Sequence, residues 1–368
     1  MPKRRPAKKR SPAAAVLLAV LCLLLLAVSR YLDSRSESAA SVLAPEAAQA
    51  DASGLEVHFL DIGQGDSALL FCGDETLLID GGKVKNNQKL IARLKELEVD
   101  HLDAVICSHP DEDHCGGLSA VLASTRTDAF YCSVDSWHTK AFSDVTNYVA
   151  EQGISVTIPQ AGDSFAFGEA SVEFLGPVED YGDDPNEGSL VARVRYGETS
   201  FLFTGDMGFE AEDDMLAAGV DVSATVLKVA HHGSAGSSST EFLQAVHPQY
   251  AVISVGADND YGHPTEAALN RLAACGIPVY RTDLLGEIIA VSDGKTVTIT
   301  SASNEAPPAS DAASQTTGSY GYVGNSSSKV VHLASCGKLP GESNRVYFAS
   351  LDEALAAGYR KHASCLGS

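Results

Sequence analysis

Residues 107–117 have the sequence CSHPDEDHCGG, which places two imidazoles and three carboxylates within a few positions of one another. The apolar run LDAVI directly before them is typical of a buried strand, and GGLSAVLAS at 116–124 has the pattern of a helix. Imidazole and carboxylate groups are the ligands that divalent transition metals prefer. The stretch therefore predicts a tight loop at a sheet edge, on which several side chains point inward at once.

Similar polar clusters follow apolar runs elsewhere in the chain. A single acid at a strand end is usually a turn or helix cap, but four strand-end clusters rich in His and Asp favour a shared metal site. Beside 107–117 they are Asp80 in LLIDGG, Asp206 in FLFTGD, and the pair His231 and His232 in LKVAHHGS; His263 in YGHPTEAAL lies in a loop before a predicted helix.

The order of predicted strands and helices indicates the architecture of the main body, residues 54–300. Its first half alternates short apolar runs with helices such as the one at 87–98, whose apolar positions 90, 91, 94 and 97 have a helical period. The second half repeats this arrangement. Two strand-rich halves with flanking helices predict an α/β fold, a four-layer α/β/β/α sandwich.

Composition narrows the class of protein. The 368 residues are 45% apolar and 20% charged, which is typical of a globular chain of two or three domains. The formal net charge is −22, and because residues 1–30 hold seven Lys and Arg and no acids, the rest has 48 acids against 19 bases, or −29. Such an acidic body argues against broad, non-specific nucleic-acid binding, but leaves open a local basic groove or a metal-mediated phosphate contact.

The N-terminal segment, residues 1–34, has six basic residues among its first ten, and then an unbroken apolar run of 16 from Ala13 to Val28. This length lies between that of a signal-peptide core and that of a membrane span. No small-x-small cleavage site follows directly, so we expect an uncleaved signal-anchor, with a cleaved signal as the alternative. The positive-inside rule then predicts a single-pass protein of the cell membrane with its body extracellular, or in the alternative a secreted protein.

Low-complexity segments divide the rest of the chain. Residues 35–53, rich in Ala, Ser and Glu, are expected to form a stalk, and residues 301–319 are expected to be a disordered linker. A small module is predicted at 320–368.

The clusters together resemble the metallo-β-lactamase fold superfamily, whose signature is His-x-His-x-Asp-His. Here it stands as His109-Pro-Asp111-Glu-Asp113-His114, with Asp at the second ligand position. The finer pattern is similar to the hydrolase domain of the DNA-uptake competence protein ComEC. The stretches that carry this likeness are FLDIGQGDSALL, LLIDGG, SHPDEDHCGGL, NEGSLVARVRYGETSFLFTGD, LKVAHHGSAGSSS and GHP.

The resemblance implies two divalent cations in one site. An Asp in the second position makes the site richer in oxygen, which shifts its preference from Zn²⁺ toward Mn²⁺ or Mg²⁺. The superfamily's usual third-motif histidine has no counterpart, since Asn186 and Ser189 occupy that region and are expected to contact substrate. The implied ligands are His109 and Asp111 for the first metal, Asp113 and His114 for the second, Asp206 as a bridge, and His231 as a late ligand.

The implied chemistry is attack by a hydroxide that two metals roughly 3.5–4 Å apart share and activate. Asp113 would orient the hydroxide, and His263 would help to stabilise charge on the departing oxygen. His232 is grouped with the catalytic residues. Lys228 is expected to contact a phosphate, with a solvated strand-edge lysine as an equal alternative.

Three other acidic or amide side chains belong to the predicted site. Asp80 is expected to orient a metal-ligand histidine from behind. Gln64 and Asp66 would bind substrate from a shaped loop, although a turn-forming role fits them equally well.

The C-terminal module carries His332-x3-Cys336 and His362-x2-Cys365, two pairs at zinc-ligand spacing. A segment of about 45 residues buries little core, so one structural Zn²⁺ is expected. The stretch resembles the metal-binding domain of the Ada DNA-repair protein, in which four cysteines bind the metal. Two histidines replace cysteines here, which implies a structural or DNA-contacting role; a Cys336–Cys365 disulfide is the alternative.

Three functions remain open on the sequence. The first is an exported metal-dependent nuclease or phosphodiesterase that cleaves extracellular DNA. The second is a two-metal hydrolase of a small phosphodiester, a cell-wall phosphoester or a β-lactam-like amide, which the acidic body favours. The third is a binding module with a vestigial hydrolase. The expected partners are DNA and, through the N-terminal segment, the membrane; no protein partner is indicated.

Overall fold

The structure is a computed structural model of the chain. The residues that it describes are 54–257, 259–303, 322–333, 336, 338–341, 344–348 and 351–366. The predicted signal-anchor and stalk, and nearly all of the predicted linker, lie outside these residues. In the described part of the chain, no helix has both the length and the apolar character needed to cross a membrane.

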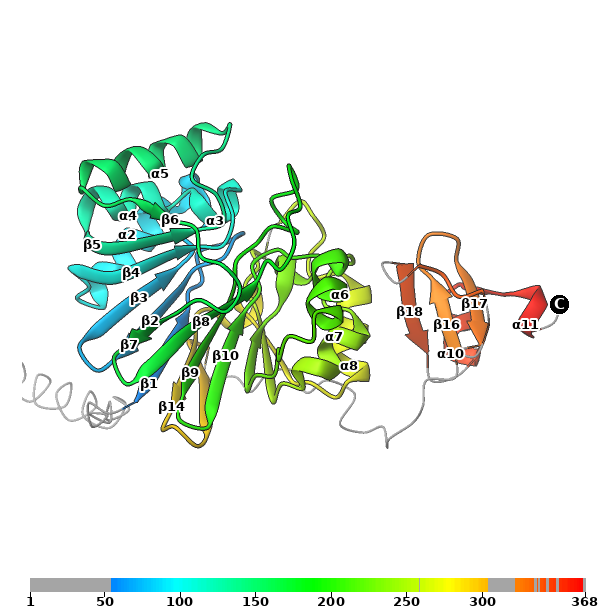
Figure 1. Ribbon diagram of the computed structural model, residues 1–368. Helices are drawn as coiled ribbons and strands as arrows, with labels where there is room; N and C mark the ends of the chain where they lie inside the picture. Colours follow the sequence, from blue (N-terminus) through cyan, green and yellow to red (C-terminus); the bar gives the residue numbers. More distant parts are fainter. Residues whose placement is uncertain are drawn as a thin grey trace, which may run out of the picture. The chain divides into compact units, whose positions relative to one another are not determined.

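Two β-sheets lie face to face in the main body (Figure 1). The strands of the first sheet are β1 (Leu55–Phe59), β2 (Ala68–Cys72), β3 (Glu75–Ile79), β4 (His101–Cys107), β5 (Arg126–Cys132), β6 (Val156–Thr157), β14 (Ile288–Ser292) and β15 (Val297–Ser301). Their spatial order is β15-β14-β1-β2-β3-β4-β5-β6. The strands of the second sheet are β7 (Ser164–Phe167), β8 (Ala170–Gly176), β9 (Val191–Tyr196), β10 (Thr199–Phe203), β11 (Val226–Lys228), β12 (Tyr250–Ile253) and β13 (Val279–Arg281). Their order is β13-β12-β11-β10-β9-β8-β7.

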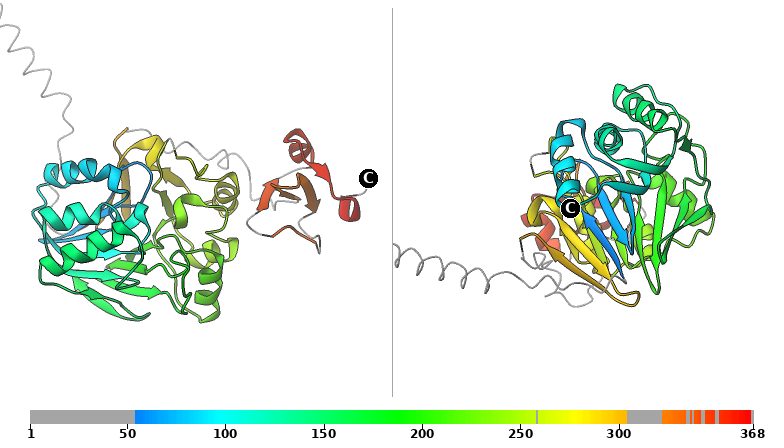
Figure 2. Two further views of the ribbon diagram at one scale, coloured as in Figure 1. Left: turned by 90° about the horizontal axis from the view of Figure 1, so that it is seen from above. Right: turned by 90° about the vertical axis from the view of Figure 1, so that its left-hand side faces the viewer.

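Helices cover the outer face of each sheet, as the views in Figure 2 also show. The first sheet carries α2 (Asn87–Glu96), α3 (Glu112–Cys115), α4 (Leu118–Ser124) and α5 (Lys140–Glu151), and the second carries α6 (Phe209–Ala217), α7 (Thr240–Val246) and α8 (Glu266–Ala274). The short elements are η1 (Val84–Asn86), η2 (Ala230–Gly233) and α9 (Thr282–Leu285). The predicted four-layer sandwich is confirmed.

Three apolar cores hold these layers together. One lies between the two sheets, and the others lie between each sheet and its helices. Helix α2 buries Leu90 and Leu94 one turn apart, as its sequence period predicts. Strand β10 is buried along its whole length, which explains why its apolar residues Phe201, Leu202 and Phe203 are consecutive rather than alternating with exposed polar ones.

Strand direction brings the polar clusters together. Strands β3, β4 and β5 run parallel, and so do β10, β11 and β12. The carboxyl ends of parallel strands meet at one edge of a sheet, where open α/β folds bind their ligands. Asp80 follows β3, Ser108 follows β4, Asp206 lies just beyond β10, and His231 lies just beyond β11.

The described part of the C-terminal module has a sheet of its own. Its spatial order is β18-β16-β17-β19, from β16 (Tyr322–Asn325), β17 (Val330–Leu333), β18 (Arg345–Phe348) and β19 (Arg360–Lys361), with helices α10 (Leu351–Ala356) and α11 (Ala363–Leu366). Its core is small and is formed by Val331, Val346, Phe348, Ala354 and Tyr359. So small a core contributes little to stability by itself.

The main difference from the sequence prediction lies in the signature motif. The expected tight loop becomes helical at Glu112, because Cys115 N–H donates to Asp111 O at 2.8 Å and Gly116 N–H donates to Glu112 O at 2.9 Å. Strand β7 and helix α9 were not predicted. Both are four residues long, too short for a period to be recognised.

Candidate metal centre

The two glycine pairs in the motifs bring two loops into backbone contact. Gly81 N–H donates to His114 O at 2.7 Å, and Gly117 N–H donates to Gly82 O at 2.8 Å. A Cβ atom on Gly117 would lie 1.9 Å from Gly81 O, so no other residue fits there without separating the loops. The GG of LLIDGG and the GG of the signature therefore place Asp80 directly behind the signature histidines.

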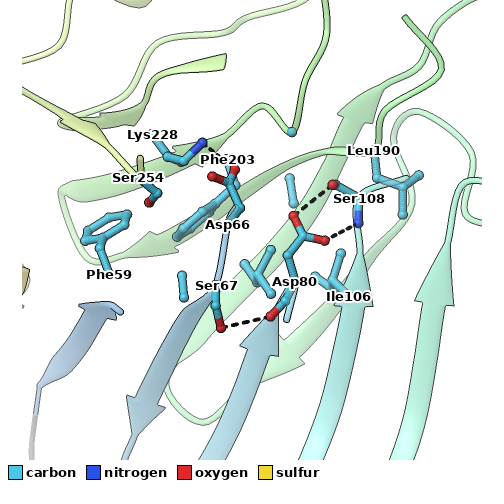
Figure 3. A pocket seen from close by; sticks show the side chains of 14 residues that line it. Phe59, Asp66, Ser67, Asp80, Ile106, Ser108, Leu190, Phe203, Lys228 and Ser254 are labelled. Carbon is cyan, nitrogen blue, oxygen red and sulfur yellow. Dashed lines mark hydrogen bonds and ion pairs between the residues drawn. The ribbon is translucent and has the colours of Figure 1, made fainter. Parts of the chain in front are cut away.

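The Asp80 carboxylate orients both of those histidines, one directly and one through Ser108. Figure 3 shows its two hydrogen bonds to Ser108. The carboxylate accepts hydrogen bonds from Ser108 N–H at 2.7 Å and Ser108 Oγ–H at 2.8 Å, and it lies 2.9 Å from His114 Nδ1. Ser108 Oγ is also 3.0 Å from His109 Nδ1. With each Nδ1 held in this way, the Nε2 atoms of both imidazoles are free to bind a cation.

Four buried side chains converge in front of Asp80. Asp66, His114, Asp206 and His232 each offer a donor atom, and these atoms all lie within 4.8 Å of one another. His114 Nε2 is 3.0 Å from Asp206 Oδ1, and His232 Nε2 is 3.6 Å from Asp206 Oδ2. The cluster draws on both sheets, since Asp66 and His114 come from the first half and Asp206 and His232 from the second.

The donor atoms of this cluster fit a cation. Five buried atoms in the described structure lie within or beside it and make no hydrogen bond of good geometry, although two of the carboxylate oxygens have an imidazole nitrogen 3.0 Å away. They are Nε2 of His109, His114 and His232, and Oδ1 of Asp66 and Asp206. A buried polar atom without a hydrogen bond costs about 1–3 kcal/mol, so several at one point call for a ligand. Their chemistry, imidazole nitrogen with carboxylate oxygen, suits Zn²⁺, Mn²⁺ or Fe²⁺.

The remaining predicted ligands surround these atoms. The His109 ring centroid is 4.1 Å from that of His114, and Asp111 Oδ2 lies 4.0 Å from His109 Nε2. Asp113 Oδ2 is 3.7 Å from His232 Nε2. His231 Nε2 is 3.6 Å from Asp206 Oδ2. There are donors enough for two cations side by side.

His263 and Asp111 lie toward the mouth of the site. The His263 ring centroid is 5.5 Å from that of His231 and 6.5 Å from that of His232. The Asp111 side chain is 40% exposed. Burial and the neighbouring His231 lower the pKa of His263 to about 4, so its imidazole is neutral at neutral pH.

The environment of the centre shifts the pKa values of two of its histidines in opposite directions. Burial and the nearby His114 lower the pKa of His109 to about 3, which keeps it in the neutral form that a metal ligand requires. Burial opposes the charged form of His232, but the Asp206 and Asp66 carboxylates outweigh it and raise its pKa to about 10. A cation that binds here therefore replaces a proton on this imidazole.

Asp66 was predicted to bind substrate and His232 to take part in catalysis, but both side chains are buried inside the metal centre. The loop that carries Asp66 is fixed under the signature, because Asp66 N–H donates to Asp113 O at 3.0 Å. His231 and His232 both have positive φ values, 51° and 53°. This turn leaves His231 30% exposed and directs His232 into the cluster, so the geometry offers His232 as a buried ligand alongside the predicted His231.

Lys228 does not lie where a substrate phosphate could reach it. It is only 3% exposed, its ammonium pairs with Asp66, and it donates to Val229 O at 2.9 Å. Figure 3 shows this pair among the side chains that line a small cavity between the sheets. The cavity has a volume of about 10 Å³, the lower limit for a single water. Lys228 was predicted either to contact a phosphate or to be a solvated lysine at the strand edge. The structure instead has it in a buried ion pair that supports Asp66.

The predicted substrate-binding residues are mainly structural in this geometry. Ser189 is fully buried, and its Oγ accepts from Asp206 N–H at 3.1 Å. Gln64 is also buried and accepts from Gly256 N–H at 3.2 Å through Oε1. Asn186 O accepts from Ser189 N–H at 3.0 Å, while Asn186 Oδ1 is buried without a hydrogen bond. Ser189 thus holds the Asp206 loop from below.

Ser108 is the residue of the site that sequence reasoning missed. It links Asp80 to both His109 and His114. The sequence did contain a signal for this role, because Ser108 is a polar residue between a buried strand and the first signature histidine.

A second cluster lies in the C-terminal module. The donor atoms of His332, Cys336, His362 and Cys365 all lie within 4.8 Å of one another. His362 Nδ1 is 3.3 Å from Cys365 Sγ and 3.7 Å from Cys336 Sγ. Both thiols are free. The set suits Zn²⁺, which is typically bound by four Cys and His ligands in structural sites.

Comparison with known proteins places residues 60–257 in the family described as the Metallo-beta-lactamase superfamily. The chain is 34% identical over 285 residues to "Competence protein ComA" of Neisseria gonorrhoeae, a match that covers 76% of this chain and 38% of that protein. It is 31% identical over 251 residues to "ComE operon protein 3" of Bacillus subtilis (strain 168), which covers 63% of this chain and 32% of that protein. The chain thus spans about a third of the length of these relatives.

Among solved structures, the metallo-beta-lactamase fold protein YhfI from Bacillus subtilis matches with a TM-score of 0.43 and 13% identity. This match covers 67% of the present chain and all of YhfI.

Proposed function

The chain belongs to the metallo-beta-lactamase superfamily of metal-dependent hydrolases, and on this basis we propose that it is a phosphodiesterase that cleaves DNA outside the cell. The observation that carries the proposal is the convergence of buried His and Asp side chains from both sheets, whose inward-facing nitrogen and oxygen atoms lack a well-formed hydrogen bond. Divalent cations held by these residues would activate water and neutralise charge on a phosphate. The likeness to the competence protein ComA and to the ComE operon protein 3 supports DNA as the substrate class.

The side chains at the mouth fit hydrolysis of a phosphodiester. Asp113 lies beside His232 and is partly exposed, so it can accept a proton from, and orient, an attacking water. The neutral imidazole of His263 can donate a hydrogen bond to a departing oxygen. Its Nδ1 makes no hydrogen bond in the described structure. Asp80 and Ser108 keep the ligand histidines in a fixed tautomer during turnover.

The proposal includes the cellular location of the catalytic domain, which we place outside the cell. The basic residues that precede the apolar run in residues 1–34 support a signal-anchor with the catalytic domain outside the cell. Protease added to intact cells should digest the domain of an exported chain. Protection until the cells are lysed would contradict export.

The test of activity uses the full-length chain with Mn²⁺, Mg²⁺ or Zn²⁺ and labelled single- and double-stranded DNA. We expect cleavage that chelators abolish and that Asp206→Ala reduces by at least a thousandfold, because that variant removes the carboxylate between the histidines. The matched control is Asp128→Ala, which removes an exposed carboxylate on β5 and should leave the rate unchanged. Absence of DNA cleavage with all three metals would overturn the proposal.

A second candidate is hydrolysis of a small phosphodiester, a cell-wall phosphoester or a β-lactam-like amide. The net charge of −29 beyond residue 30 favours it, because this charge repels polyanions. Activity on a small substrate, together with no cleavage of DNA, would select this candidate.

A further inference from the structure

An exposed aromatic side chain stands at the mouth of the metal centre. Tyr261 is 58% exposed, although large apolar and aromatic side chains are mostly buried in the described structure. Its ring is stacked near His263, with centroids 5.8 Å apart and an angle of 23° between the planes. His263 in turn lies beside His231 and His232, so only the His263 ring separates the Tyr261 ring from the histidines of the metal centre.

A lysine from the opposite half of the fold joins the ring to the centre. Lys83, just after the LLIDGG motif, donates to Tyr261 Oη at 3.1 Å, and its Nζ is 4.9 Å from the ring centroid. The same Nζ lies 3.8 Å from Asp113 Oδ2. Val84, the next residue, is 43% exposed, so a small apolar surface adjoins the charge.

Hydrogen bonds of one side chain hold the described part of the loop that carries Tyr261. The Asn259 side chain donates to Gly256 O at 2.8 Å and to His263 O at 2.7 Å, and it accepts from His263 N–H at 2.9 Å. One side chain thus ties together the two ends of the segment, with Tyr261 at its tip. A ring that is already held in place loses little entropy when a ligand stacks on it.

We propose that Tyr261, oriented by Lys83, is a stacking platform for an unpaired nucleobase next to the phosphate at the metal centre. The proposal rests on the phosphodiesterase function above and gives its substrate class as single-stranded DNA. Aromatic rings bind the bases of single strands with little sequence preference, because every base has a flat face. A base paired inside a duplex has both faces covered by its neighbours and cannot use the platform.

The test compares two single strands with the same backbone charge, using the full-length chain with Mn²⁺. One is an oligothymidylate, and the other is an oligomer of the same length built of abasic tetrahydrofuran residues. We expect Tyr261→Ala to raise KM for the oligothymidylate roughly tenfold or more, with kcat within about twofold, and to leave KM for the abasic strand unchanged. Tyr261→Phe keeps the ring and should retain most of the affinity. The matched control, Ile158→Ala, removes another exposed apolar side chain and should change neither value.

Two outcomes overturn the platform. One is an unchanged KM for the oligothymidylate in Tyr261→Ala, and the other is an equal rise for both strands, which would indicate an effect on the site rather than on a base. Neither outcome contradicts the proposed phosphodiesterase function. That function is supported if the unaltered chain cleaves the oligothymidylate and the Asp206→Ala variant does not. If the unaltered chain cleaves neither strand, both proposals fail.

Discussion

At the scale of single residues, Asp80 has an unusual backbone for its type. Its φ is 59°, in the left-handed region that Asn and Asp tolerate better than most residues. From this position its carboxylate receives Ser108 and His114 together. The backbone conformation and the hydrogen bonds therefore serve one purpose, the orientation of the ligand histidines.

Asp80→Asn should weaken metal binding without unfolding the chain. Asn tolerates the same φ but lacks the negative charge that holds His114, and loss of such a support typically costs about 10–100-fold in metal affinity. Isothermal titration with Mn²⁺ measures the change. The control is Asp74→Asn, an exposed carboxylate in the turn between β2 and β3. An unchanged Kd for Asp80→Asn would show that the histidines need no support from behind.

At the scale of elements, a partly buried ionic group ties β1 to α2 and to the start of β14. His58 Nδ1 lies 2.6 Å from Glu287 Oε1, and His58 Nε2 lies 2.7 Å from Glu56 Oε1. Arg93 of α2 donates to Glu287 Oε2 at 2.7 Å. Burial opposes the charged form of His58, but its hydrogen bonds with the two carboxylates outweigh burial and raise the pKa above the usual 6.5.

This group predicts a pH-dependent part of the stability. Because the pKa of His58 is higher in the folded state, its contribution is complete below about pH 6.5 and is lost as the pH rises through the folded pKa. His58→Gln should therefore lower the free energy of unfolding by roughly 1–3 kcal/mol at pH 6, and by less at pH 9. Urea unfolding of both chains across this range measures the difference. A difference that stays constant with pH would contradict a charged His58.

Two buried charged residues, Glu212 and Arg271, hold the serine-rich loop that follows the HHGS motif. Glu212 accepts from Ser239 N–H at 2.7 Å and from Ser238 N–H, while Arg271 donates to Ser238 O at 2.8 Å and to Ser237 O at 2.6 Å. Burial raises the pKa of Glu212 to about 8. The serine-rich loop therefore has a fixed shape despite its composition.

Glu212→Ala should destabilise the chain by roughly 2–5 kcal/mol, because two buried N–H groups lose their acceptor. The measurement is the free energy of unfolding in urea. Glu210→Ala, two residues away and exposed on the same helix, is the matched control and should change stability by less than about 0.5 kcal/mol. Equal effects of the two substitutions would mean that the Glu212 contacts are not needed.

At the scale of the whole molecule, the two metal-binding clusters should act independently. The module has a small apolar core of its own, and a structural Zn²⁺ held by its cluster would stabilise the module rather than take part in hydrolysis. Cys336→Ser together with Cys365→Ser should remove one equivalent of zinc, measured by elemental analysis, and make the module sensitive to protease. Hydrolysis by the main body should stay within about twofold of the unaltered chain. Loss of hydrolysis would instead assign the module a part in the reaction. Its likeness to the Ada metal-binding domain stays a prediction.

The sequence predicted the sandwich and the gathering of its polar clusters, because apolar runs and the residues that end them are local signals. It could not predict which members of a cluster turn inward. His231 and His232 are neighbours of the same type, and only the positive φ values of the folded chain separate them. Lys228 resembled a surface lysine because its partner Asp66 lies far away in the sequence. Contacts between distant segments, rather than patterns within one segment, decided these roles.

The division of the four-residue cluster between two sheets also bears on assembly. Asp66 and His114 cannot meet Asp206 and His232 until both sheets have formed and packed together. A cation that then binds acts as a cross-link between the halves, and its binding free energy adds to that of the packed apolar layer. Resistance to unfolding should consequently rise with the concentration of free metal, so the supply of cations in the surroundings sets how long the folded chain survives there.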